Sequence, residues 1–161
     1  MELPARTFDR ELIARHLRRR QDGVDDFVTR LALSDLTDRL LTVKRPFTRA
    51  AIMAPDAALL PIEGRSGDGR FSFTPLSTLA GPAPLDTEAL TLPDPPYDLI
   101  VSIFDLQVVN DVPGFLARAR AHLAPDGLFL AATIGGNSLT ELRQAFLAAD
   151  AEVNGGAFAR V

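Results

Sequence analysis

The residues able to do chemistry are sparse in this chain, and their spacing matches no common catalytic pattern. There is no cysteine, which excludes a disulfide framework, thiolate metal sites and a cysteine nucleophile. His16 and His122 fall on different predicted helices, so their spacing gives no metal site. No Ser–His–Asp arrangement, carboxylate pair or phosphate-binding loop stands out. General acid–base reasoning therefore predicts neither a catalytic residue nor a metal centre.

One stretch near the end of the chain has the small residues that ligand sites use. Gly135 and Gly136 follow an apolar run, residues 128–132, that predicts a buried strand. Small residues at the carboxyl end of a strand leave room for a ligand, although they equally form a tight strand-to-helix connection. Ser138, with Glu141 three residues later, predicts a capping box at the start of the next helix.

Two predicted helices make up an N-terminal part, residues 1–45. The first covers residues 8–21, and its polar face carries Arg10, Arg15, Arg18, Arg19 and Arg20. Such a face can bind an acidic lipid or partner, but a solvated surface explains it better. The second covers residues 25–43 and is predicted to place six apolar side chains on one broad stripe: Phe27, Val28, Leu31, Leu36, Leu40 and Leu41.

Residues 46–161 form the predicted α/β core. The apolar runs 49–54 and 97–102 predict two core strands. Residues 58–62 and 70–74 each predict a shorter strand. Between Ala54 and Arg70 no helical pattern is present, so the connection there is either an irregular crossover or a local hairpin.

The helix that follows residues 97–102 has a clear start. Asp111 is a good N-cap and Pro113 fits the first turn. This helix is expected to bury Phe115, Leu116, Ala119 and Leu123. Residues 125–127 then read as a turn into the next strand.

Composition limits the functional class. The 161 residues fit one domain, and the net charge of −4 argues against nucleic-acid binding. No apolar run approaches the roughly 20 residues that a membrane helix needs. The N-terminus lacks the apolar core of a secretory signal and carries Glu2, Asp9 and Glu11, unlike transit peptides. A cytoplasmic location is the default expectation.

The order of strands, turns and helices from Tyr97 onwards resembles the second half of a class I S-adenosylmethionine-dependent methyltransferase. The segment Gly135–Arg143 resembles the methyltransferase-like assembly factor of respiratory complex I and its α-proteobacterial relatives. More distantly, it is similar to the malonyl-carrier-protein methyltransferases of biotin synthesis. Phe8-Asp9-Arg10 stands where the assembly-factor family opens. The resemblance implies a single α/β domain, residues 1–161, with a Rossmann-like methyltransferase sheet and N-terminal helices.

The same resemblance locates the expected cofactor site. The family's first turn reads Leu-Asp-x-Gly-x-Gly-x-Gly, and alignment puts Ile52 at the Asp and Ala54 at the first Gly. The acidic residue expected near residues 73–77 is absent. The implied cofactor-binding residues for S-adenosylmethionine are therefore Ala54, Asp56, Glu88 and Phe104. Because two landmarks are missing, loss of high-affinity cofactor binding is the favoured interpretation.

The sequence leaves three functions open. The first is a methyltransferase-like, assembly-factor-related protein with a degenerate cofactor site. The second is a non-catalytic binding or assembly module, and the third is a small-molecule binder that uses the vacated pocket. The helix and strand pair that end the family's domain are absent here, which predicts an open sheet edge for a protein partner or a second copy.

Overall fold

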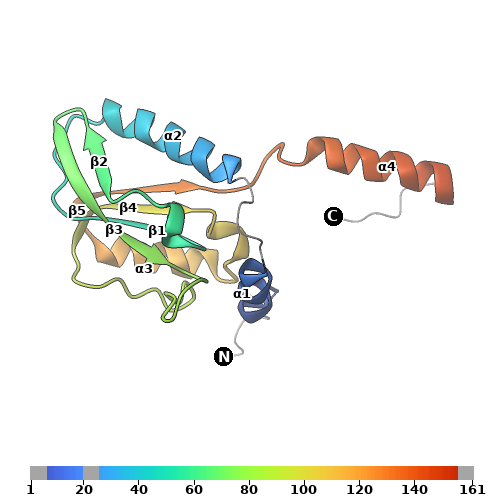
Figure 1. Ribbon diagram of the computed structural model, residues 1–161, viewed down its shortest axis with the longest axis horizontal. Helices are drawn as coiled ribbons and strands as arrows, with labels where there is room; N and C mark the ends of the chain where they lie inside the picture. The colour runs from blue at the N-terminus through green and yellow to red at the C-terminus, as the bar shows by residue number, and fades with distance from the viewer. Residues whose placement is uncertain (1–6, 20–25, 156–161) are drawn as a thin grey trace.

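The computed structural model describes residues 7–19 and 26–155, and the predictions that concern residues 1–6, 20–25 and 156–161 lie outside this range (Figure 1). Five strands form one sheet in the order β2-β3-β1-β4-β5. Their bounds are β1 Ala50–Ala54, β2 Glu63–Ser66, β3 Gly69–Ser77, β4 Tyr97–Ile103 and β5 Leu123–Ala132. β3, β1, β4 and β5 are parallel, and β2 pairs antiparallel with β3. This mixed sheet confirms the predicted Rossmann-like fold class.

The helices lie on both faces of the sheet and beyond its carboxyl ends. They are α1 Arg10–Arg18, α2 Phe27–Thr42, α3 Val112–His122 and α4 Thr140–Asn154. α2 covers one face and α3 the other, whereas α1 lies near the carboxyl ends of the strands and α4 projects away from the sheet (Figure 1). No helix in the described ranges is long and apolar enough to cross a membrane. The division at residue 45 into two parts of one domain stays a prediction.

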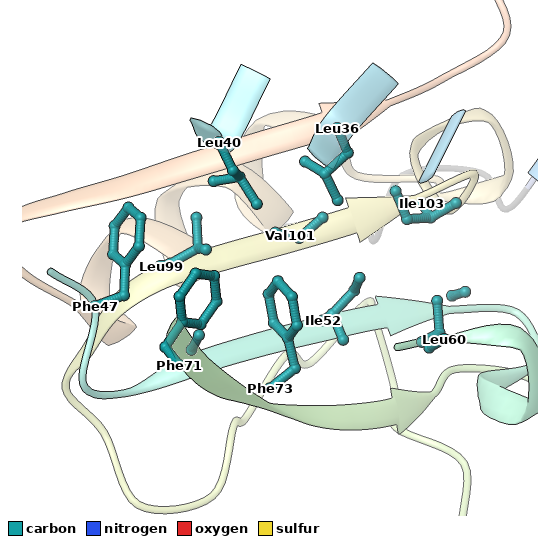
Figure 2. Close-up of a cluster of buried hydrophobic side chains, with 12 residues drawn as sticks. Leu36, Leu40, Phe47, Ile52, Leu60, Phe71, Phe73, Leu99, Val101 and Ile103 are labelled. Carbon is teal, nitrogen blue, oxygen red and sulfur yellow. The ribbon is translucent and has the colours of Figure 1, made fainter. Parts of the chain in front are cut away.

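The core under α2 is built around aromatic side chains. Leu36 and Leu40 of α2 pack towards a cluster that includes Phe47, Phe71 and Phe73 (Figure 2). The Phe71 ring lies edge-on to the other two, with ring centroids 5.2 Å and 4.9 Å apart. Edge-to-face pairs of this kind add stability beyond the area that they bury.

A glycine in β2 makes this aromatic packing fit. Gly64 pairs with Phe71 across the hairpin, and a Cβ at Gly64 would lie 2.4 Å from the Phe71 ring. The ring thus covers the glycine backbone, which pins the hairpin register. Both alternatives for residues 54–70 hold in part, because β1 and β3 are parallel neighbours joined by an irregular connection that contains β2, and β2 forms a local hairpin with β3.

Several expected elements differ from the structure. Residues 58–62 are not a strand, because Ala57–Leu59 form a short 3-10 helix (η1) whose first turn is capped by Asp56. The predicted stripe on α2 is wrong: only Leu36 and Leu40 are buried, while Phe27 and Leu31 are 60% and 68% exposed.

The C-terminal half also departs from expectation. The strand predicted over residues 128–132 starts earlier, at Leu123, and the expected turn at 125–127 falls within β5, where the register against β4 shifts. β5 is the sheet's edge and is half-exposed rather than buried. Leu116 of α3 is 41% exposed, not buried.

The two predicted helix starts have opposite outcomes. The α3 start is confirmed, because the Asp111 carboxylate accepts a hydrogen bond from the Gly114 amide at 2.9 Å. The capping box before α4 is wrong. Ser138 Oγ donates instead to the Gly135 carbonyl, and Leu139 precedes the helix in a left-handed conformation, with a φ of 61° and no side-chain cap.

Candidate functional site

The carboxyl edge of the parallel strands is where ligands bind in open α/β sheets. In this molecule that edge is formed by the turn after β1, the segment after β3 and the turn after β4. The four residues that the resemblance implies for the cofactor, Ala54, Asp56, Glu88 and Phe104, all lie in or beside these segments.

The turn after β1 is closed by the chain's own hydrogen bonds. The Thr78 amide donates to the Ala54 carbonyl at 2.9 Å. The amides of Leu79 and Ala80 both donate to the Pro55 carbonyl, at 3.1 Å and 2.9 Å. The segment after β3 is therefore bonded directly onto the β1 turn.

The side chains at this turn are also engaged. Ala54 is buried. Asp56 accepts a hydrogen bond from the Ala58 amide at 2.9 Å and so caps the 3-10 helix. Leu60 follows that helix and packs into the same core cluster as Ala54 and Phe73, beyond the carboxyl end of β1 (Figure 2). Neither of the two cavities beside α1 is lined by Ala54 or Asp56.

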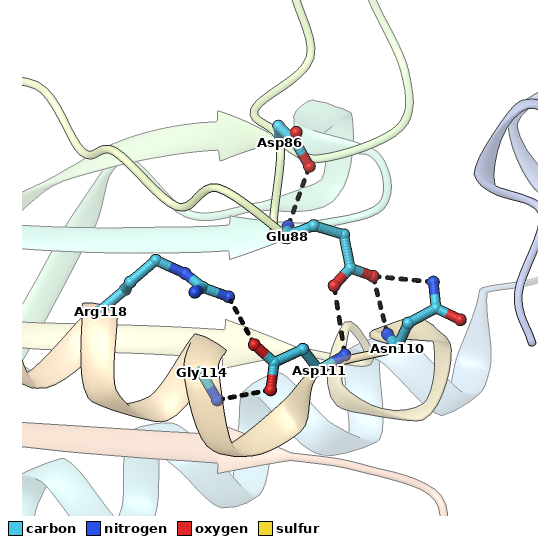
Figure 3. Close-up of polar contacts among 6 residues, drawn as sticks. All are labelled: Asp86, Glu88, Asn110, Asp111, Gly114 and Arg118. Atoms are coloured by element: carbon cyan, nitrogen blue, oxygen red, sulfur yellow. Dashed lines mark hydrogen bonds and ion pairs between the residues drawn. The ribbon is translucent and has the colours of Figure 1, made fainter. Parts of the chain in front are cut away.

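Glu88 forms the best-defined polar contacts among the four (Figure 3). One carboxylate oxygen accepts from the Asn110 backbone and side-chain amides at 2.7 Å and 2.9 Å, and the other accepts from the Asp111 amide at 3.2 Å. Burial acts to raise the pKa of Glu88, but these hydrogen bonds and the nearby Arg10 charge together hold it below its usual range. Glu88 therefore connects the loop before β4 to the start of α3.

Phe104 directly follows β4 and has an unusual backbone conformation. Its φ is 59°, in the left-handed region that aromatic residues rarely adopt. Its amide donates to the Ala132 carbonyl at 2.8 Å, which holds the end of β5 beside the turn. The half-buried ring packs against the core cluster under α2.

A buried carboxylate that sequence reasoning missed lies at the centre of this edge. Asp105 directly follows Phe104, is fully buried, and accepts hydrogen bonds from Thr78 Oγ1 at 2.5 Å and Ser102 Oγ at 3.1 Å. Burial raises the pKa of Asp105 to about 6, against the opposing effects of these two hydroxyls and the Arg10 charge. The available signal was an acidic residue just after a buried strand.

Arg10 joins this cluster to α1. Its guanidinium donates to Thr87 Oγ1 at 2.5 Å and to the Thr78 carbonyl at 2.7 Å. Beside it, the Asn110 side chain bonds the backbone of Phe8 in both directions, at 2.8 Å and 3.2 Å. Because α1 buries none of its own residues, these polar contacts attach it to the sheet.

The turn residues nearest β5 are the least enclosed. Gln107 accepts a hydrogen bond from Thr133 Oγ1 at 3.1 Å, which brings η2 (Leu106–Val108) to the end of β5. Gly135 and Gly136 are exposed, and a Cβ at either would meet open space. In the described ranges no group of three or more acidic or histidine side chains is placed to hold a metal ion.

Comparison with known proteins identifies homologues that include NDUFAF5 proteins and O-methyltransferases. The rat protein "Arginine-hydroxylase NDUFAF5, mitochondrial" is 42% identical over 71 residues, which cover 44% of this chain and 21% of the rat protein. The malonyl-[acyl-carrier protein] O-methyltransferase of Xylella fastidiosa is 33% identical over 111 residues, which cover 69% of this chain and 36% of that protein. The corresponding enzyme of Gallionella capsiferriformans is 36% identical over 69 residues, 43% of this chain and 24% of that protein.

No protein-family profile matches the chain, and no solved structure matches it. The chain spans only about a fifth to about a third of the length of these curated relatives. Sequence similarity and the mixed five-stranded sheet nevertheless agree. The chain is a homologue of the methyltransferase-like proteins that include NDUFAF5 and the malonyl-[acyl-carrier protein] O-methyltransferases, and it has their Rossmann-like type of fold.

Proposed function

We propose that this chain is a methyltransferase-like assembly or binding module that does not use S-adenosylmethionine. The observation that carries the proposal is the closed turn after β1, where the Thr78, Leu79 and Ala80 amides occupy the carbonyls of Ala54 and Pro55. Residues 78–80 therefore lie against this turn, and a cofactor that approached its backbone closely would have to displace them.

The side chains at the turn support the same conclusion. Asp56 caps a short helix, and both carboxylate oxygens of Glu88 accept hydrogen bonds from the α3 start. Both carboxylates already accept hydrogen bonds from the chain itself, rather than from the ribose hydroxyls or the amine of a cofactor. Leu60 fills the space beyond β1 as part of the core. These residues do not fit S-adenosylmethionine, so no methyl-transfer step is assigned to them.

Calorimetry tests this proposal directly. The chain is titrated with S-adenosylmethionine and separately with S-adenosylhomocysteine, up to about 1 mM ligand. The absence of binding heat with either supports the proposal, because the KM values of working enzymes typically lie between about 1 μM and 1 mM. Micromolar binding would overturn it. That result would favour the second candidate, a divergent methyltransferase, which the similarity to the O-methyltransferases supports.

Two separate exposed features would serve an assembly role, the open side of β5 and the apolar side chains of α4. β5 is the last strand of the sheet in the described residues, where one row of its backbone groups has no strand partner. α4 carries exposed large apolar side chains, including Leu142, Phe146 and Val153. Exposed apolar area and an open strand edge are each typical of protein–protein contacts. The occupant is either a second copy of this chain or a different protein.

Sedimentation velocity at rising protein concentration tests the first of these. A concentration-dependent dimer that Phe146→Ser weakens at least tenfold, while Leu116→Ser on α3 leaves it unchanged, supports self-association through α4. Both residues are exposed helix positions, so the pair is matched. If the chain stays monomeric, the homodimer is excluded and a different protein is the proposed occupant. The resemblance to the complex I assembly factor supports this second possibility. The cytoplasmic location stays a prediction.

A further inference from the structure

A groove separates α1 from the segment that follows β3. Its volume is about 420 Å³, which lies within the range of small-molecule sites. One wall is the face of α1 that carries Arg15 and Arg18, and the other includes Leu79, Pro84 and Leu85. The groove shares Thr78 and Leu79 with the segment that bonds the β1 turn, but it is lined by none of the four residues implied for the cofactor.

The arginines in this groove differ in how they are bound. Arg10 is anchored by Thr87 and the Thr78 carbonyl. Arg15 and Arg18 are exposed, three residues apart on one helix face, and within the described residues neither guanidinium has a hydrogen bond or an ion pair. A pair of free guanidiniums beside a third fixed cation is suited to anionic oxygens.

The acidic residues of the groove do not neutralise these cations. Glu11 and Asp86 also line it, so the formal charge of its lining is one positive unit. The Asp86 carboxylate accepts a hydrogen bond from the Glu88 amide at 2.9 Å, which directs it towards its own loop (Figure 3). Excess positive charge in a concave site attracts anions more strongly than an isolated surface charge does.

The opposite wall is apolar. Leu79 is buried and Leu85 is half-buried, and Pro84 lies beside them. A ligand that reaches both walls needs anionic oxygens at one end and a compact apolar body at the other. Inorganic ions satisfy only the first requirement.

We propose that the groove between α1 and residues 78–86 binds a small organic anion, a phosphate ester or carboxylate with a compact apolar body. The anionic oxygens pair with Arg15 and Arg18, and the body lies against Leu85 and Pro84. The proposal does not depend on the proposed function, because the groove contains none of the four residues implied for the cofactor and no residue of β5.

Phenyl phosphate is the probe, with phenol and inorganic phosphate as the two half-ligands. The full chain, labelled with ¹⁵N, is titrated with each compound while amide chemical shifts are followed. Phenyl phosphate is expected to shift amides of residues 10–18 and 78–86 with a Kd of about 1 mM or below, at least fivefold tighter than either half-ligand.

A double variant, R15Q/R18Q, tests the contacts. Both side chains are exposed and α1 has no buried residue, so the fold and its Tm should be unchanged. Affinity for phenyl phosphate should fall at least tenfold. Arg120→Gln, an exposed arginine on α3 outside the groove, is the matched control and should bind like the unmodified chain.

Three results would overturn the proposal. The first is no shift in either segment up to about 10 mM phenyl phosphate. The second is equal binding by R15Q/R18Q. The third is equal affinity for phenyl phosphate and inorganic phosphate, which would mean that the apolar body contributes nothing to binding. Repeating the S-adenosylmethionine calorimetry with R15Q/R18Q separates the two proposals, because binding heat that the variant retains arises outside the groove.

Discussion

The carboxyl edge of the sheet has a closed half and an open half. Around β1 and β3, backbone carbonyls, the buried Asp105 and the side chain of Leu60 all have partners within the chain. Around β5 and α4, an edge strand is half-exposed and no described side chain of α4 is buried. Near β1 and β3, the groups that could contact a ligand are thus hydrogen-bonded or packed within the chain. On β5 and α4, backbone and apolar groups are exposed and could contact another protein.

This difference indicates which half can accept a partner without rearrangement. A ligand at the β1 turn would have to break several internal hydrogen bonds, each costing about 1 kcal/mol net. A partner at β5 or α4 would replace only water. We therefore expect substitutions in the closed half to change stability, and those in the open half to change association.

The largest expected contrast is between two leucines. Leu60→Ala should lower the free energy of unfolding by about 2–4 kcal/mol, because Leu60 is 8% exposed and packs in the core cluster. Leu147→Ala on α4 should change it by less than about 0.5 kcal/mol, because Leu147 is 42% exposed. Urea denaturation followed by circular dichroism measures both. Equal losses of unfolding free energy in the two variants would contradict the distinction between the closed and the open half of the molecule.

The second prediction concerns the pH dependence of stability. Burial raises the pKa of Asp105 to about 6, above its ordinary value, so between about pH 4 and 6 the folded chain holds more protons at this carboxyl than the unfolded chain. Its contribution therefore falls as pH rises through this window, by up to about 3 kcal/mol. Asp105→Asn removes the titration and should gain stability relative to the unmodified chain as pH rises from 4 to 6.

The free energies of unfolding of the unmodified chain and of Asp105→Asn are compared at each pH, so that the contributions of the other carboxylates cancel. Glu88 and Asp98 have lowered pKa values, Asp98 chiefly because the Thr48 hydroxyl donates to it at 2.6 Å. Their stabilisation is present at higher pH and is lost as pH falls through those lowered values, which is the opposite sign. A stability difference between the two proteins that does not change from pH 4 to 7 would contradict the raised pKa of the buried Asp105 carboxyl.

The smallest predicted contrast separates a capped helix from an uncapped one. Asp111→Ala should cost about 1 kcal/mol, because it removes the hydrogen bond to the Gly114 amide and the ion pair with Arg118 at 3.5 Å. Ser138→Ala should cost less than about 0.5 kcal/mol, because Ser138 Oγ bonds only within the turn before α4. Thermal unfolding of both variants provides the measurement. A larger loss for Ser138→Ala would mean that the α4 start is capped after all.

The sequence predicted the strongly patterned elements well. β1 and β4 are short apolar runs between turn residues, and α3 begins at an aspartate followed by proline. Those signals are local, and they lie where the sheet is buried on both faces. The family resemblance from Tyr97 onwards also pointed to the right fold class.

The errors arose where tertiary contacts override local patterns. Six apolar residues on α2 predicted one stripe, but the sheet covers only the end that contains Leu36 and Leu40. The Ser138 and Glu141 pair has the spacing of a capping box, yet the left-handed Leu139 places the helix start beyond Ser138.

The site residues were predicted with the same mixed success. Glu88 and Asp56 were named from the resemblance and lie beside the expected edge, but whether any of the four binds a cofactor stays a prediction. Asp105 was missed because its burial depends on Thr78, which is 27 residues away in sequence. Its position just after a buried strand was the one local signal, and that signal does not show that Thr78 bonds the carboxylate.

The attachment of α1 has a dynamic consequence. A helix with no fully buried side chain, held by Arg10 and Asn110, has less apolar area to lose on detaching than a buried strand has. It should open as a unit of its own, with fast amide exchange, while β1 and β4 stay protected. Any ligand in the groove beneath α1 would bind only the docked form. Occupancy of the groove would therefore be visible as slowed exchange in the N-terminal helix, far from the strands that give the fold its stability.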